Sequence, residues 1–184
     1  MKKIIFAAAA LSTIASAPAF ASDTDTQDLL VTATVPQECS IGNVADVTFA
    51  AVNINQNAEA GALMINGNSN SSQSGIWTSC NYAAKITVAG TPLLNTAGAT
   101  LAANDPTNFT NSINYFVSFE AGSNGGFSKV VHNTRSNGAS SSTTPTGAFH
   151  TQAKLGVTIA PGDNAKRPVA GIYSGTTTIT LSVS

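Results

Sequence analysis

Apolar and polar residues alternate with a period of two along most of the chain, and this pattern predicts β-strands. The longest run places six residues on one face: Phe149, Thr151, Ala153, Leu155, Val157 and Ile159. A second run does the same with Ile113, Tyr115, Val117 and Phe119. Because successive side chains of a strand point to opposite faces, each run is expected to bury one face against a core.

Shorter alternating runs fall near residues 29–35, 47–51, 63–65, 76–88 and 173–183, separated by Gly, Asn and Pro turn residues. Helical periodicity is nearly absent. Short strands in this arrangement are typical of an all-β sandwich. We expect one such domain over residues 39–184, with long loops at 91–111 and 122–147, of which the second is low in complexity and expected to be mobile.

The N-terminus has the pattern of an export signal. Lys2 and Lys3 precede an apolar stretch over residues 4–15, and Ala19-Phe20-Ala21 forms a small-x-small cleavage site. The apolar stretch is too short to span a bilayer. Residues 1–21 are therefore predicted to be a signal peptide, and the mature chain is expected outside the cytoplasm and not membrane-spanning.

The chain contains two cysteines, Cys39 and Cys80, 41 positions apart. An even pair in an exported chain is expected to form one disulfide, because the compartment is oxidising. Each cysteine lies in a strand-like stretch. The bond would therefore join an early strand to a later one.

Charged residues make up only 9% of the chain, against about 25% in typical domains. Without Lys2 and Lys3, six basic and nine acidic residues remain, a net charge of −3. Since no basic patch occurs, nucleic acid and anionic lipid are not expected as partners. Such a surface suits a protein that packs in arrays, and it suits an ordinary secreted β-domain equally well.

The residues needed for catalysis are scarce. The two histidines, His132 and His150, are expected at the surface, and no Gly-x-Ser-x-Gly motif occurs. Asp23, Asp25 and Asp28 begin like a calcium loop but lack its glycine and its final glutamate. We therefore expect no enzymatic activity, no cofactor and no metal site.

Aromatic residues offer a second way to bind a ligand, by stacking on sugar rings. The candidates are Trp77, Tyr82, Tyr115 and Phe116. Core packing is the favoured interpretation, because Tyr115 shares a face with Val117 and Phe119. Phe116 points the other way and is the better candidate for an external contact.

Four segments together resemble the subunits of bacterial chaperone–usher pili, in the spore coat protein U-like branch of archaic pili. They are residues 31–35 (Val-Thr-Ala-Thr-Val), residues 39–41 (Cys-Ser-Ile) with the second cysteine about forty residues later, residues 113–117 (Ile-Asn-Tyr-Phe-Val) and residues 170–183. The resemblance extends over essentially the whole mature chain.

The resemblance implies an incomplete immunoglobulin-like sandwich that lacks its last strand. A periplasmic chaperone would lend that strand, and an outer-membrane usher would exchange it for the N-terminal segment of another subunit. The donor segment would be residues 22–38, with Leu29, Val31, Ala33 and Val35 inserted into the neighbour. Ile179, Leu181 and Val183 would line the acceptor groove. The subunit would pass through the periplasm to a surface pilus that supports adhesion or biofilm formation.

One departure concerns the position next to last, where many pilins have an aromatic residue and this chain has Val183. An alternative from another class is a secreted, monomeric carbohydrate-binding or adhesin module. It would have a complete sandwich and exposed aromatic residues on one face.

Overall fold

A computed structural model describes residues 26–123, 125–136, 138–145 and 147–183. The predicted signal peptide lies outside these residues. The chain divides into two units, Met1–Val35 and Pro36–Ser184. The described part of the second unit contains twelve strands and two short helices: β1 (Cys39–Ile41), β2 (Ser69–Cys80), β3 (Ala84–Gly90), β4 (Leu93–Leu94), α1 (Ala99–Asn104), β5 (Phe109–Thr110), β6 (Ser112–Ile113), β7 (Phe116–Ala121), β8 (Val130–Asn133), β9 (Ser140–Thr143), β10 (Phe149–Ile159), η1 (Pro161–Asp163), β11 (Arg167–Pro168) and β12 (Thr177–Val183).

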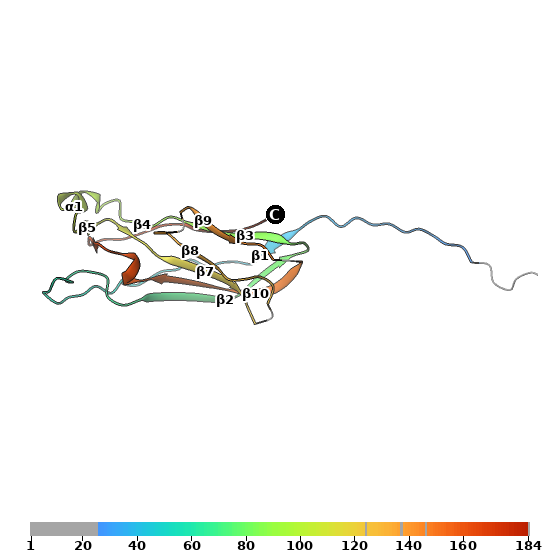
Figure 1. The fold of residues 1–184 in the computed structure, drawn as a ribbon, viewed down its shortest axis with the longest axis horizontal. Helices are drawn as coiled ribbons and strands as arrows, with labels where there is room; N and C mark the ends of the chain where they lie inside the picture. Colours follow the sequence, from blue (N-terminus) through green and yellow to red (C-terminus); the bar gives the residue numbers. More distant parts are fainter. Residues whose placement is uncertain (1–25, 124, 137, 146, 184) are drawn as a thin grey trace, which may run out of the picture. The chain divides into compact units, whose positions relative to one another are not determined.

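The fold of this unit is all-β and sandwich-like, as the alternating pattern predicts. An antiparallel five-stranded sheet has the order β1-β2-β10-β7-β8, and a three-stranded sheet has the order β12-β3-β9. Figure 1 shows β3 and β9 in one layer and β2, β7 and β10 in the other. Two small pairs, β4 with β6 and β5 with β11, complete the described strand pairing.

The core lies between the two sheets and is built from the predicted faces. In β10, every residue of the apolar set from Phe149 to Ile159 is buried, while His150, Gln152 and Lys154 are exposed. Ile113, Tyr115, Val117 and Phe119 are also buried. From the three-stranded sheet, β3 contributes Ala84, Ile86 and Val88, all fully buried. The run over residues 149–159 is therefore confirmed as one core strand. The run over residues 113–119 is buried as predicted, but it is divided between β6 and β7, and Asn114 and Tyr115 belong to neither strand.

A β-bulge in β2 changes which of its residues face the core. Ala153 pairs with Ile76 and Leu155 with Gln73, so Ser74 and Gly75 lie opposite the single residue Lys154. Gly75 has φ +77°, a conformation that glycine adopts without strain. Beyond the bulge the even-numbered residues Ile76, Thr78 and Cys80 point inward. Trp77 consequently points away from the core.

Two stretches differ from the sequence-based expectation. The predicted loop over residues 122–147 contains β8 and β9, which pair with β7 and β3 respectively. The predicted short strand around Val47 and Phe49 does not form: the described chain has no strand between Ile41 and Asn53. Val47 and Phe49 still pack against the core as half-buried side chains.

Residues 26–35 of the first unit have neither helix nor strand. Their apolar side chains are largely exposed: Leu29 84%, Leu30 87%, Val31 79% and Val35 77%. Exposure of several large apolar side chains in one short segment is unfavourable in water.

Candidate functional site

An apolar groove of about 750 Å³ runs along one edge of the sandwich. Its floor consists of core side chains from β7, from β10 and from the residues just before β7: Ile113, Tyr115, Val117, Leu155, Val157 and Ile159. One flank is formed by residues 44–52, and the other by residues 171–177 together with Ile179. Strand β12 thus borders the groove at its beginning.

The β12 flank has an unpaired edge. Within the described residues, β12 is the terminal strand of its sheet and pairs only with β3, from Thr177 opposite Gly90 to Val183 opposite Ala84. Each strand residue directs backbone groups to alternate sides, so half of the N–H and C=O groups of β12 face away from β3. An open edge of this kind accepts an additional strand through backbone hydrogen bonds.

The opposite flank also has backbone groups without partners. Gln73 holds Ala45 through two hydrogen bonds, with the Ala45 amide donating to Oε1 at 3.0 Å and Nε2 donating to the Ala45 carbonyl. After Ala45, residues 46–52 make no backbone hydrogen bond within the described part of the chain. Both sides of the groove therefore present free hydrogen-bonding groups above an apolar floor.

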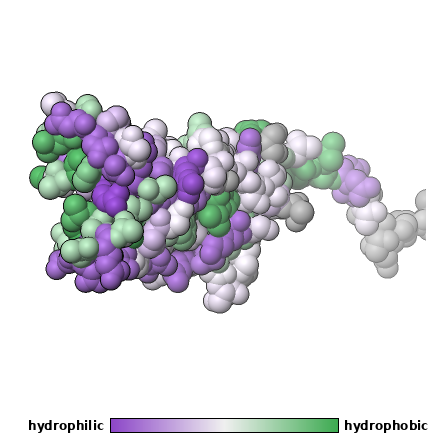
Figure 2. Space-filling view, turned by 60° about the vertical axis from the view of Figure 1, so that its left-hand side comes forward, coloured by the Kyte–Doolittle hydropathy of each residue, from purple (hydrophilic) through white to green (hydrophobic). Residues whose placement is uncertain are grey.

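The groove continues into a second apolar hollow of about 660 Å³, which we call the side pocket. The two share six lining residues: Ala50, Ala51, Val52, Ile113, Gly171 and Tyr173. Ile54, Leu63 and Leu101 line the side pocket with exposed side chains. Figure 2 shows apolar surface on the end of the domain that carries α1.

Tyr173 lies where the groove meets the side pocket. Its hydroxyl donates to the Val169 carbonyl at 2.8 Å, and the Thr110 carbonyl lies 3.3 Å away. Burial raises the pKa of Tyr173 above its usual value of 10.0, and hydrogen bonds with Asn95 and the Val169 backbone oppose that shift only in part. Burial at the junction therefore disfavours ionisation of the phenol.

The residues proposed to line an acceptor groove occupy different environments. Ile179 lines the groove. Leu181 is half-buried and packs against the core, and Val183 is 63% exposed. The groove's main apolar surface comes instead from the inner faces of β7 and β10, which the sequence identified only as core.

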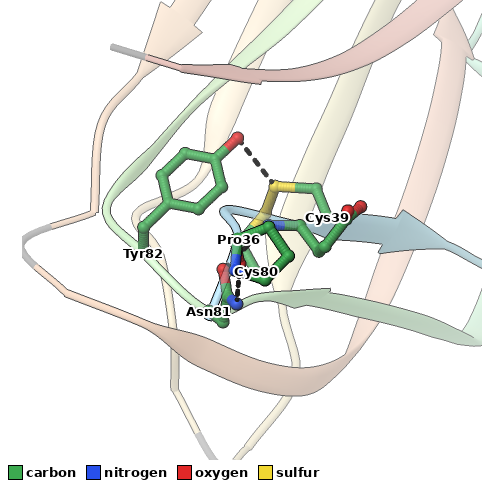
Figure 3. Close-up of a disulfide and its surroundings, with 6 residues drawn as sticks. Pro36, Cys39, Cys80, Asn81 and Tyr82 are labelled. Carbon is green, nitrogen blue, oxygen red and sulfur yellow. Dashed lines mark hydrogen bonds between the residues drawn. A yellow bond between two sulfur atoms is a disulfide. The ribbon is translucent and has the colours of Figure 1, made fainter. Parts of the chain in front are cut away.

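The disulfide predicted from the sequence is present and joins neighbouring strands. Cys39 of β1 lies directly opposite Cys80 of β2. The Tyr82 hydroxyl lies 3.3 Å from the Cys39 sulfur, to which it can donate a hydrogen bond (Figure 3). The bond therefore fixes a three-residue strand to the long β2 strand.

Asn81 fixes the start of the second unit beside the disulfide (Figure 3). Its Nδ2 donates to the Pro36 carbonyl at 2.8 Å, and its Oδ1 accepts from the Glu38 amide at 2.9 Å. The Asn81 backbone amide also donates to the Glu38 carbonyl at 3.1 Å. The chain is thus held on both sides of Gln37, immediately after the exposed apolar segment.

The histidines lie in contrasting places. His150 is exposed, as expected, and stacks on Trp77. His132 is fully buried, so the prediction of a surface position is wrong. Its Nε2 donates to the Gly90 carbonyl at 3.1 Å, while Nδ1 has no partner among the described residues.

The aromatic candidates also separate. Tyr115 belongs to the core, as expected, whereas Trp77 is 49% exposed and the core interpretation is wrong for it. Tyr82 and Phe116 are half-buried. In the described residues no three His, Cys, Asp or Glu side chains cluster as metal ligands would. No helix in that part of the chain has the length and apolar character needed to cross a membrane.

Comparison of the chain with models of protein families, with curated proteins and with solved structures finds no match.

Proposed function

We propose that this protein is a non-enzymatic structural subunit of a surface pilus, and that it polymerises by inserting an N-terminal strand into the groove of a neighbouring copy. The observation that carries the proposal is the groove itself. An apolar floor lies between two stretches of unpaired backbone, the free edge of β12 and residues 46–52. An extended peptide with alternating apolar side chains satisfies both requirements together.

The segment proposed to fill the groove lies within residues 22–38, of which residues 26–38 are described. Its inserted part would end before Pro36, because Asn81 of the same domain holds Pro36 and Glu38. Leu29, Val31, Ala33 and Val35 alternate with Leu30, Thr32 and Thr34. In an extended strand the first set points to one face and reaches the floor of the groove. Burial of one Leu or Val side chain contributes about 1.5–3 kcal/mol. The exposed segment and the open groove therefore complement each other chemically.

The proposal includes two helper proteins. A periplasmic chaperone would occupy the groove with a strand of its own, and an outer-membrane usher would exchange that strand for the donor segment of the next subunit. An exported chain with a disulfide fits this route. The subunit would then reside in a pilus on the cell surface that supports adhesion or biofilm formation.

The test compares two double variants in the cell that makes the protein. Leu29→Asp with Val31→Asp places charges on the face that enters the groove, where an unpaired charge is costly to bury. Thr32→Asp with Thr34→Asp adds the same charge to the opposite face of the same segment. We expect multimers, seen on gels of unheated samples and as fibres by electron microscopy, only from the threonine variant.

Equal behaviour of the two variants, whether both assemble or neither does, contradicts the donor assignment. A wild-type chain that stays monomeric at every concentration, alone and with its helper proteins, contradicts the pilus proposal and favours a monomeric adhesin module.

A further inference from the structure

The outer face of the five-stranded sheet carries an exposed aromatic pair that the groove does not use. Trp77 of β2 is the only tryptophan in the chain and is 49% exposed. His150 of β10 stacks on it, with 4.6 Å between ring centroids and 14° between ring planes. A large aromatic side chain is normally well buried, so one displayed on a sheet surface is informative.

The pair is held in place by its neighbours. Both residues belong to strands in the most extensive ladder of the domain, where Gln152 lies opposite Trp77 and Ser79 opposite His150. On the other side of Trp77, the Gly42 amide donates to the Trp77 carbonyl at 2.7 Å, and Gly42 has no side chain to cover the indole. The imidazole stacks on one face of the indole, and about half of Trp77 remains exposed to solvent.

The groups around the pair are polar but carry no formal charge. Gln152 and Ser40 are exposed on the same face, and Ser79 lies between Ser40 and His150 in the strand register. Charged side chains stand further out on this face. Lys154 lies opposite Glu120 one step along β10, Lys129 pairs with Glu120, and Glu38 is exposed two residues before Ser40. The surface therefore offers amide and hydroxyl groups beside an aromatic ring, which suits a neutral, hydroxyl-rich ligand.

We propose that Trp77 and His150 form a stacking platform for one pyranose ring of a neutral glycan. The apolar face of a pyranose presents weakly positive C–H bonds, which are attracted to the negative face of an indole ring. Its equatorial hydroxyls would reach Gln152 and Ser79 beside the platform. This binding site is independent of the groove, and a subunit that carries it would contact sugars wherever the sheet face is exposed.

The single tryptophan provides a direct measurement. The full mature chain is titrated with cellotetraose and with chitotetraose, both neutral, and with tetragalacturonate, which is anionic, while Trp77 emission is recorded. We expect a saturable change in emission with at least one neutral tetrasaccharide and a weaker response with the anionic one. Because Trp77 is the only tryptophan, the change in tryptophan emission reports on this residue. The same measurement can be made on monomers and on fibres.

Variants separate the platform from the rest of the face, with binding measured by calorimetry. Trp77→Ala should weaken binding at least about tenfold, as removal of a central aromatic contact does. His150→Ala should also weaken it, and His150→Phe, which keeps a stacked ring, should retain it. Val131→Ala is the control, because Val131 is exposed on β8 at the far edge of the same sheet.

No saturable response to either neutral tetrasaccharide overturns the proposal. So does binding that survives Trp77→Ala, or that falls equally with Val131→Ala. These experiments do not measure assembly into fibres. A negative result for sugar binding therefore leaves the pilus proposal unaffected, and that proposal is tested separately by the donor-segment variants.

Discussion

Tyr173 is a residue whose acid–base chemistry is altered by its place in the fold. It lines both the groove and the side pocket, and its hydroxyl is bonded to the Val169 carbonyl. A phenol in this position resists ionisation, because burial removes water that would stabilise the phenolate.

This gives a prediction about alkaline stability. The pKa of Tyr173 is raised in the folded protein, so the folded state holds a proton that the unfolded state releases as pH rises above about 10. The free energy of unfolding should therefore be unaffected by this group below pH 10 and should fall above it. In Tyr173→Phe the neutral-pH value should drop by about 0.5–1.5 kcal/mol for the lost hydrogen bond.

Denaturant unfolding at pH 7 and at several values above pH 10 measures both effects. The decline above pH 10 should be shallower in Tyr173→Phe than in wild type. Tyr82→Phe is the matched control, because Tyr82 lies outside both hollows. Identical alkaline profiles for wild type and Tyr173→Phe would contradict the assignment.

Two errors of sequence-based prediction concern single residues, Trp77 and His132. The position of Trp77 depends on the bulge at Gly75, which reverses the inward and outward positions of β2. His132 is buried because its ring reaches the Gly90 carbonyl, 42 residues away in sequence. Alternation of apolar and polar residues reveals neither the bulge nor the hydrogen bond. It therefore could not place the side chains of Trp77 and His132.

At the scale of elements, β12 is the strand on which the proposal depends. Its first residues border the groove, and its last residue, Val183, is exposed. The strand therefore supplies both a test position and a control position with the same backbone pairing to β3.

Ile179→Asn should weaken insertion of a donor strand, because it places an amide against the apolar floor of the groove. Val183→Asn should leave insertion unchanged. A labelled synthetic peptide of residues 26–37 is titrated with each variant, and fluorescence polarisation gives the affinity. Equal affinities would show that Ile179 is not part of the acceptor surface.

The strands of the core were predictable, since β7 and β10 alternate without interruption. The flank at residues 46–52 was not, although Val47, Phe49 and Ala51 alternate in the same way. A strand needs a neighbour to pair with, and within the described residues this segment has none. The alternating side chains at residues 46–52 are those of a strand, but the described part of the domain provides no neighbouring strand for their backbone to bond.

At the scale of the whole molecule, the disulfide closes a loop of 41 positions that contains the whole of one groove flank. In the chain-entropy description, closing a loop of this length stabilises the fold by about 4 kcal/mol. This is a large share of the stability of an ordinary domain, about 5–15 kcal/mol.

Replacement of both cysteines, Cys39→Ala with Cys80→Ala, should lower the free energy of unfolding by about 2–4 kcal/mol. Guanidinium unfolding of the disulfide-bonded chain and of the double variant gives the value. Tyr82→Phe is the control, because it removes the hydroxyl near the Cys39 sulfur and keeps the bond; it should cost less than about 1 kcal/mol. A double variant as stable as wild type would show that the bond contributes nothing to the fold.

The hydrogen bonds of Asn81 and the Cys39–Cys80 disulfide together fix the start of the domain, and this has a mechanical consequence. In a fibre joined through N-terminal segments, tension enters each subunit at Pro36 and reaches β1, a strand of three residues that would separate easily by itself. The covalent bond transfers the load to β2, whose pairing with β10 extends from Ser69 to Cys80. A pull along that long ladder loads many hydrogen bonds in shear at once, so the oxidised subunit should withstand forces that would unzip a reduced one from its first strand.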